Sequence, residues 1–274
     1  HRALDFYRNE RAYLTEPAYK FYIDQPEALA PVREFTKAKF EARQENSPQF
    51  KALLLFQNLL RFHLDDEAPK ALVFTDLKRL EYVHEKGIMG EKDELYLKAL
   101  KRLENKYKES PSSAAATYYR AKYHADRADS YRPNPEEVGK WDYKTAREIC
   151  EEVIEKYPDS WGAGHCKNLL AQIEQKEVNF RTEEVNLPDQ PFRLLLEYRN
   201  LEKAHLRIAP VDPKMQEKMG RMSRNELVDY LRGLKPVKAW SVELPQEGDY
   251  HRHSVELPVE GLPLGLYTIL LCDD

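Results

Sequence analysis

Cysteine, glycine and long apolar runs are all scarce in this chain. Its 274 residues include three Cys, and no two of them form a Cys-x-x-Cys pair, which excludes a disulfide-built scaffold and a structural zinc site. Ten Gly suit helices better than a fold built from loops. No apolar run is long enough to span a bilayer, and neither an initiator Met nor a signal peptide opens the sequence. We therefore expect a fragment of a larger protein, for which missing targeting signals say nothing about the compartment.

An excess of positive charge is also missing. Lys and Arg number 43 against 47 Asp and Glu, which gives a net charge of −4. Nucleic-acid-binding and membrane-surface proteins carry a basic stripe, so this balance argues against both classes. With 33% charged and 42% hydrophobic residues, the composition is that of a globular chain with long exposed helix faces. The length suggests two domains, because single hydrophobic cores stop growing near this size.

Catalytic motifs are the third absence. The sequence has no Gly-rich phosphate loop and no Gly-x-Ser-x-Gly elbow, and no nucleophile–base pair can be proposed from it. The sequence therefore predicts no catalytic, cofactor-binding or metal-binding residue, and no small-molecule substrate.

The spacing of apolar residues changes within the stretch 177–191. Before it, apolar residues recur at helical spacing, and after it they alternate as they do in strands. Pro188 and Pro191 mark the change. This pattern predicts a helical domain over residues 1–180 and a strand domain over residues 181–274, with a final strand expected beyond Asp274.

Helical periodicity predicts six helices in the first part. The sequence around Pro26, Pro31 and Pro48 resists assignment, apart from a brief alternation at 18–23 that fits an extended segment. The first helix is apolar on nearly all sides, so we expect it to be central and covered. Ser110-Pro111 predicts a helix N-terminus. The expected helices cover 49–62, 69–87, 93–107, 111–125, 142–158 and 160–176.

The stretch 142–158 resembles the second helix of a tetratricopeptide repeat. Tyr143, Ala146, Cys150 and Pro158 fall where that repeat places its aromatic, small, bulky and terminal residues. The sequence Glu-Asn-Lys-Tyr at 104–107 is echoed fifty residues later by Glu-Lys-Tyr at 155–157. These features predict a degenerate, antiparallel α-solenoid of about six helices.

Alternating apolar residues predict strands in the second part. One face carries Phe192, Leu194, Leu196 and Tyr198, and the stretch 200–203 suggests a hairpin turn into a returning strand. Ser223 and Glu226 form the signature of a helical capping box, and Gly233 suits a left-handed C-terminal position. Further strands are expected over 237–244, 251–257 and 265–272, the last apolar on both faces and therefore central or covered. Together they predict an antiparallel β-sandwich with a helical insert.

Several of these motifs resemble a known family. The stretch 190–208 resembles the opening strands of a macroglobulin domain, and 262–271, with its Pro-x-Gly-x-Tyr turn, is similar to a late strand of the same domain. Leu4-Asp-Phe-Tyr7, the helix around 52–63 and the stretch 77–82 resemble the N-terminal region of bacterial alpha-2-macroglobulin family proteins of the Bacteroides type.

The resemblance implies a large cell-envelope protease inhibitor, periplasmic or associated with the outer membrane. In such proteins a protease cleaves a bait segment and is then trapped, in many members through a thioester within Cys-Gly-Glu-Gln. That string is absent here, since Cys150 precedes Glu, Cys166 precedes Lys and Cys272 precedes Asp. The resemblance thus implies a non-catalytic scaffold or interaction fragment with protein partners, and any membrane anchor would lie outside these residues. The alternative is a tetratricopeptide-type adaptor of the envelope that binds a peptide or protein.

A few residues allow both a functional and a structural interpretation. Cys150 and Cys166 can form a disulfide across two helices, but we favour two reduced core thiols. His251 and His253 share a strand face and can chelate a metal, although a structural role is favoured because no third ligand is evident. Tyr118, Tyr119 and Tyr123 either line a ligand groove or pack between repeats. The remaining candidates are interpreted as structural or as surface charge: His63, His84, His124, His165, Glu151-Glu152 and Glu183-Glu184.

Overall fold

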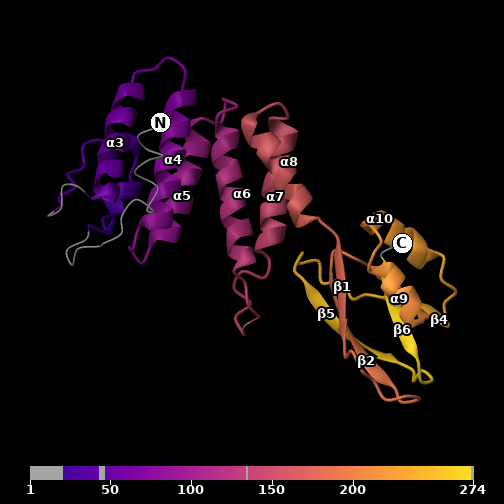
Figure 1. Ribbon diagram of the computed structural model, residues 1–274. Coiled ribbons are helices and arrows are strands. Elements are labelled where there is room, and N and C mark those ends of the chain that lie inside the picture. The colour runs from indigo at the N-terminus through magenta and orange to yellow at the C-terminus, as the bar shows by residue number, and fades with distance from the viewer. Residues whose placement is uncertain (1–20, 43–46, 134, 273–274) are drawn as a thin grey trace. The chain divides into compact units, whose positions relative to one another are not determined.

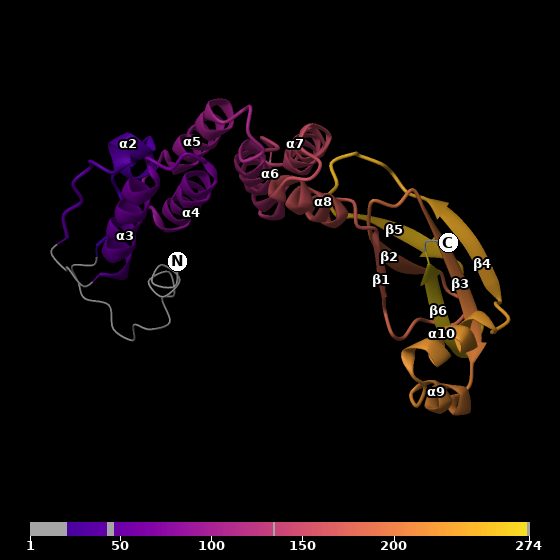
Figure 2. The same ribbon diagram turned by 90° about the horizontal axis from the view of Figure 1, so that it is seen from above.

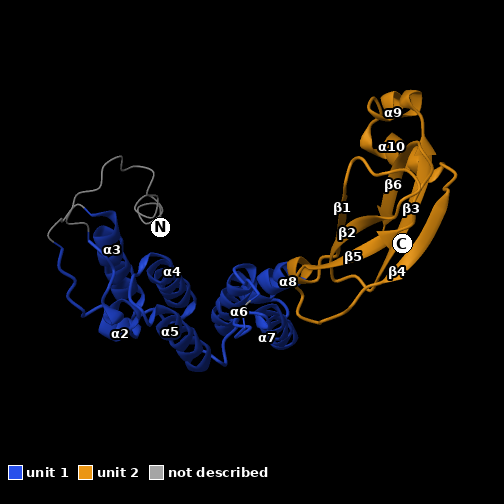
Figure 3. Cartoon of the chain, turned by 90° about the horizontal axis from the view of Figure 1, so that it is seen from below, with its two compact units in different colours: residues 1–170 blue, residues 171–274 orange. Residues whose placement is uncertain are grey.

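The computed structural model describes residues 21–42, 47–133 and 135–272. The chain divides into two compact units, His1–Leu170 and Ala171–Asp274, which are coloured separately in Figure 3. This division falls inside helix α8 (Trp161–Ile173), whereas the sequence suggested a boundary after residue 180. The resemblance noted at residues 4–7 and the start of the alternation at 18–23 lie outside the described residues.

The first unit is built from helices (Figure 1), and each of the six expected helices is confirmed. One predicted end is wrong. Residues 110–112 form a turn in which the N–H of Ser112 donates to Oγ of Ser110 over 3.2 Å, and α6 begins only at Ser113. The helices are η2 (Pro26–Leu29), α2 (Val32–Phe35), α3 (Pro48–His63), α4 (Lys70–Lys86), α5 (Lys92–Lys106), α6 (Ser113–Asp129), α7 (Asp142–Lys156) and α8 (Trp161–Ile173).

Apolar stripes pack these helices together. One core cluster extends from the segment around Ile23 to α6, and a second joins α6, α7 and α8, which lie side by side in Figure 2. The expectation that α3 is covered on most sides is wrong, because Phe62 is 76% exposed and Leu54 is 37% exposed. Among the described residues, α4 and the segment before α3 cover it, and Gln57 fixes that segment by donating to the carbonyls of Phe35 and Ala38.

A buried arginine ties the same segment to α4. Nη1 of Arg79 donates to the carbonyl of Ala28 over 2.7 Å and Nη2 to that of Ala30 over 3.0 Å, while Nε binds Asp76 over 2.8 Å. Burial lowers the pKa of Arg79, and the neighbouring Asp76 carboxylate opposes that shift. These bonds satisfy carbonyls at the end of η2 that have no partner within the helix.

The helical hairpins repeat in structure as well as in sequence. Helices α5 and α7 both run for 15 residues and start fifty positions apart, at Lys92 and Asp142. Each is followed by the same turn: the N–H of Ser110 donates to Tyr107 over 2.8 Å, and that of Ser160 to Tyr157 over 3.0 Å. The pairs α5–α6 and α7–α8 therefore share the length of their first helix and the turn that follows it, whereas their second helices have 17 and 13 residues.

The second unit contains two antiparallel sheets of three strands each, in the orders β1-β2-β5 and β4-β3-β6. One core cluster draws on both sheets, and its central members include Leu194 and Leu196 of β2 and Leu206 and Ile208 of β3, all 0% exposed. The predicted inward faces of these strands are confirmed. The strands are β1 (Glu177–Thr182), β2 (Phe192–Arg199), β3 (Lys203–Val211), β4 (Lys238–Glu243), β5 (His253–Val259) and β6 (Leu266–Cys272).

Two strand predictions are wrong. First, β1 lies in the stretch 177–191, where the sequence predicted a domain boundary and no strand, because only Val178 and Phe180 carry its alternation among polar residues. Second, β2 and β3 do not form a hairpin. They belong to different sheets, and Asn200, with φ of 54°, lies where the chain crosses between them. Among the described strands β6 is at the edge of its sheet, so the alternative that it is covered by sequence beyond Asp274 stays a prediction.

Two short helices, α9 (Pro213–Met219) and α10 (Arg224–Arg232), connect β3 to β4. The sequence did not predict α9. The capping box of α10 is confirmed, with the Ser223 N–H donating to the Glu226 carboxylate over 2.9 Å. Gly233 has φ of −75°, so the predicted left-handed conformation is wrong. The fold as a whole is mixed α and β, with antiparallel pairing throughout the described strands.

Candidate functional site

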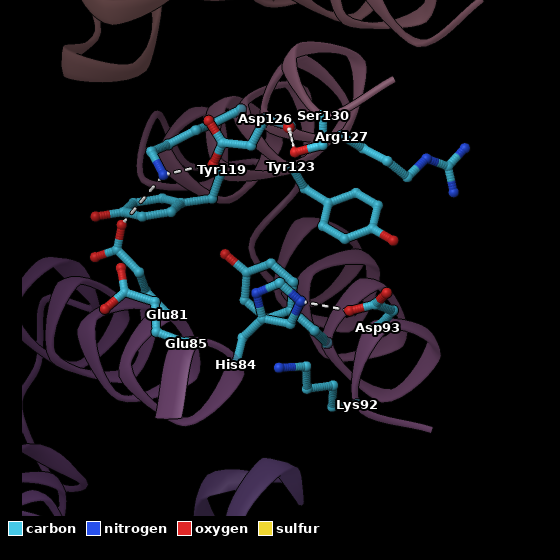
Figure 4. Close-up of a pocket in the computed structure, with 12 residues that line it drawn as sticks. Glu81, His84, Glu85, Lys92, Asp93, Tyr119, Tyr123, Asp126, Arg127 and Ser130 are labelled. Atoms are coloured by element: carbon cyan, nitrogen blue, oxygen red, sulfur yellow. Dashed lines mark hydrogen bonds and ion pairs between the residues drawn. The ribbon is translucent and has the colours of Figure 1, made fainter. Parts of the chain in front are cut away.

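A groove of about 350 Å³ lies between α4, α5 and α6 of the first unit (Figure 4). Each helix presents one face to it, because residues three and four positions apart lie above one another on a helix. We call it the helical groove. Its lining residues are Glu81, His84 and Glu85 from α4, Lys92, Asp93 and Tyr96 from α5, and Tyr119, Lys122, Tyr123, Asp126, Arg127 and Ser130 from α6 and its C-terminus.

Lys122 lies between two carboxylates across the groove. Its Nζ is 2.9 Å from Asp126 on the same helix and 3.7 Å from Glu81, so the pair with Glu81 links α6 to α4. Burial alone would lower the pKa of Lys122, but the hydrogen bond and the charge of Asp126 raise it above its ordinary value. Lys122 therefore stays charged. Figure 4 shows Glu85 beside Glu81 on the same wall, and Glu85 is exposed.

His84 is held by aromatic rings and a carboxylate. Its Nε2 is 2.7 Å from Asp93, and its ring stacks on Tyr96 with centroids 4.3 Å apart and an interplanar angle of 14°. Tyr123 meets the same imidazole edge to face at 5.6 Å. Burial raises the pKa of Tyr96, so that its hydroxyl stays protonated. These contacts fix the orientation of the His84 ring, which forms part of the aromatic wall of the groove.

An aromatic cluster continues the groove toward α8. Tyr119 stacks on Trp161 with centroids 6.3 Å apart, and Phe74 meets Trp161 edge to face at 5.1 Å. The Trp161 ring lies 3.8 Å from that of His165 and is 43% exposed. We call Phe74, Tyr118, Tyr119, Trp161 and His165 the aromatic cluster. It brings three helices of one unit to a single solvent-accessible apolar surface.

The groove contains a serine, Ser130. It donates to the backbone carbonyl of Asp126 over 3.2 Å, and no hydrogen bond joins it to His84 among the described residues. A serine nucleophile needs a base within hydrogen-bond reach, and His84 is not placed to serve as that base for Ser130. The groove presents aromatic rings and paired charges to solvent.

The three tyrosines singled out in the sequence were expected either to line a ligand groove or to pack between repeats, and both descriptions apply. Tyr119 and Tyr123 line the helical groove, whereas Tyr118 lies in the aromatic cluster against Trp161 and His165. Burial raises the pKa of Tyr118 and of Tyr123. All three thus combine packing with access to one surface.

The cysteine prediction is confirmed. Cys150 and Cys166 are free thiols, both 0% exposed, in the core shared by α6, α7 and α8. The pKa of Cys150 is raised by its hydrogen bond to Cys166 and by burial, which keeps the thiol unreactive.

The other candidate residues are dispersed. His63 pairs with Asp66 over 2.7 Å, and His124 with Asp142 over the same distance. His165 lies in the aromatic cluster. The carboxylates of Glu151-Glu152 and Glu183-Glu184 are exposed. His251 precedes β5 rather than lying on it, so the predicted shared strand face of His251 and His253 is wrong.

Sequence reasoning missed most of the helical groove. Glu81 and Glu85 on α4 and Lys122 and Asp126 on α6 were not singled out, and His84 was interpreted as structural. The available signal was their spacing of three and four residues, which places each set on one face. The spacing does not say that these faces lie opposite each other.

Comparison with known proteins gives no family assignment, since no family profile and no curated protein matches the sequence. Among the described residues, no helix combines the length and the apolar character that a membrane span requires.

Proposed function

We propose that this chain is a non-catalytic protein-interaction scaffold that binds an extended segment of a partner protein in the helical groove. The observation that carries the proposal is the continuity of the helical groove with the aromatic cluster through Tyr119, which belongs to both. Partly exposed aromatic rings supply binding energy, and the charged wall supplies specificity.

The charges of the groove indicate what the partner segment carries. Lys122 is already paired with Glu81 and Asp126, and Arg127 bonds to Asp142 over 2.8 Å, so these cations are neutralised within the chain. Glu85 is exposed beside them. A segment with a basic residue for the Glu81–Glu85 wall and an apolar or aromatic residue for Trp161 matches this surface.

The wider assignment rests on the resemblance to bacterial alpha-2-macroglobulin family proteins. We propose that the scaffold is part of such a protease inhibitor of the cell envelope, with its helices forming a tetratricopeptide-like array and its sheets a macroglobulin-type sandwich. The repeat of hairpins at fifty residues and the core shared by two antiparallel sheets support this context. The alternative is a free-standing adaptor of the envelope, which uses the same groove.

Selection from a displayed peptide library against the whole chain tests the groove. Enriched peptides should contain basic and aromatic positions, and the Trp161→Ala and Glu85→Lys variants should bind them at least about tenfold more weakly. Lys98→Ala, an exposed residue of α5 outside the groove lining, is the matched control and should bind unchanged. Enriched peptides that bind all variants equally would overturn the proposal.

The choice between inhibitor and adaptor requires the complete parent protein. A protease trap should carry further β domains after this segment, and a protease mixed with it should keep its activity on small substrates while losing it on proteins. A parent protein that leaves protein cleavage unchanged would favour the adaptor.

A further inference from the structure

The second unit contains an acidic pocket far from the helical groove in sequence. The loop after β4 crosses to β5 in the other sheet, and it lines a pocket of about 240 Å³. Among the described residues, four carboxylates and two imidazoles line it, and neither Lys nor Arg does. Such a lining concentrates negative charge and favours a bound cation. Its ionisable residues are Glu174, Glu202, Glu247, Asp249, His251, His253, Tyr198 and Tyr250.

His253 is oriented within this pocket by a buried carboxylate. Its Nε2 is 2.8 Å from Oδ1 of Asp249, whose side chain is 3% exposed. The same oxygen accepts the backbone N–H of His251 over 3.0 Å. An ionised carboxylate only accepts hydrogen bonds, so Nε2 of His253 carries the proton that Asp249 accepts. In the neutral imidazole the lone pair is then on Nδ1.

The second imidazole nitrogen faces another carboxylate. Nδ1 of His253 is 3.7 Å from Oε1 of Glu247. When the imidazole is neutral both atoms are acceptors, so a cation between them would be bound by both. Ligands at about 2.0–2.2 Å from a zinc ion in tetrahedral geometry are separated by roughly 3.3–3.6 Å, so this spacing needs an adjustment of only a few tenths of an ångström.

We propose that Nδ1 of His253 and the carboxylate of Glu247 bind a divalent transition-metal ion, with Zn²⁺ as the best fit. Asp249 is the positioning residue, because a carboxylate that accepts the other N–H of a ligating histidine fixes both its tautomer and its orientation. Ligand atoms of Glu247, Asp249 and His253 all lie within 4.8 Å of one another. Solvent reaches the site, since the Glu247 side chain is 48% exposed, and water would complete the coordination.

The donor set decides the class of metal. Calcium and magnesium prefer oxygen ligands alone, whereas an imidazole nitrogen combined with carboxylates suits zinc and its first-row neighbours. The ion would fasten the loop that joins the two sheets, and it would stabilise the second unit because the unfolded chain has no assembled site.

Titration calorimetry on the chelator-treated full chain with Zn²⁺ tests the site. We expect about one equivalent to bind, and the binding to raise the unfolding temperature of the sheet unit. We expect that one equivalent of Zn²⁺ no longer binds to Glu247→Gln, at a half-exposed position, or to His253→Gln. Asp249→Asn should weaken it about 10–100-fold without abolishing it, as expected for a residue that acts through His253.

The control is His63→Gln. It alters a histidine–carboxylate pair of similar length in the helical unit, outside the helical groove, and should leave the bound Zn²⁺ in place. A full chain that takes up no Zn²⁺ at concentrations up to roughly 1 mM would overturn the inference. Binding that persists in both Glu247→Gln and His253→Gln would overturn it as well. Neither result bears on the helical groove.

Discussion

Close packing between α6 and α8 depends on the absence of a single side chain. A Cβ atom on Gly162 would lie 2.2 Å from the carbonyl oxygen of Ala114, so the two helix backbones approach each other only because Gly is present. A Cβ on Gly164, two residues later, meets nothing within 4 Å. The pair offers an internal comparison of the same substitution in two environments.

We predict that Gly162→Ala destabilises the helical unit by at least about 1–3 kcal/mol, because the helices must move apart. Gly164→Ala should stabilise it by about 0.5–1 kcal/mol, because Ala has the higher helix propensity and no clash arises. Denaturant unfolding followed by circular dichroism measures both. Equal effects of the two substitutions would show that the backbones are not in close contact.

Arg79 is the second residue whose environment permits a sharp prediction. Arg79→Met leaves the carboxylate of Asp76, which is 1% exposed, without its charge partner, and we expect a loss of about 3–5 kcal/mol. Hydrogen exchange over residues 26–35 should accelerate, because the carbonyls of η2 lose their donors.

Two variants complete that experiment. Arg33→Met, at an exposed position of α2, should change stability by no more than about 0.5 kcal/mol. The double variant Arg79→Met with Asp76→Asn should recover part of the loss, since no buried charge is left unpaired. A double variant as unstable as the single one would contradict the assigned role of the ion pair.

At the scale of elements, a histidine couples α6 to α7. Burial lowers the pKa of His124 below its ordinary value of 6.5, although the hydrogen bond and the charge of Asp142 oppose the shift. The unfolded chain therefore takes up a proton at this residue more readily than the folded chain. Stability rises with pH between the folded pKa and 6.5, and this contribution is lost as the pH falls below about 6.5.

We predict that His124→Gln reduces the loss of stability of the helical unit on acidification from neutral pH. The amide of Gln can still donate to Asp142 but does not titrate. Unfolding free energies of both proteins, measured from pH 7.5 downward in small steps, provide the test. Parallel curves for the two proteins would contradict the prediction.

The strands show that the sequence can fix which side chains face inward without fixing which strand lies alongside. The alternation over 192–199 and 203–211 fixes which side chains face inward, and the structure places Leu194, Leu206 and Ile208 in the core. The same alternation suits a hairpin and a crossing between sheets equally well. The crossing occurs because both apolar faces are then buried against each other in one core.

At the scale of the whole molecule, the two units have separate cores. The clusters of the helical unit contain residues up to Leu170, and the cluster of the sheet unit begins at Val178. Cooperative unfolding follows shared cores, so each unit should unfold as its own transition.

We predict two calorimetric transitions for the intact chain. Leu206→Ala, in the core of the sheet unit, should lower one transition at a cost of about 2–5 kcal/mol, and Gly162→Ala should lower only the other. A single transition that shifts with both substitutions would mean that the units share an interface large enough to couple them.

The sequence by itself determined most of the elements and their buried faces, although it did not predict β1 or α9. The spacing of Val73, Leu77 and Leu80 predicts the inward stripe of α4, and the Ser223–Glu226 signature predicts the start of α10. These features depend on residues within one or two turns, which the local sequence contains in full. The hairpin repeat was also visible, because it recurs at a fixed spacing.

Only the tertiary structure decided which faces meet. The helical groove requires Glu81 of α4 to lie opposite Lys122 of α6, and the acidic pocket requires a loop to return Glu247 to His253. The partner of a polar face depends on how distant elements pack, and the energy that selects this packing comes from the apolar cores rather than from the polar residues themselves. The sequence therefore specifies the elements of this protein locally, whereas both candidate sites arise from long-range packing.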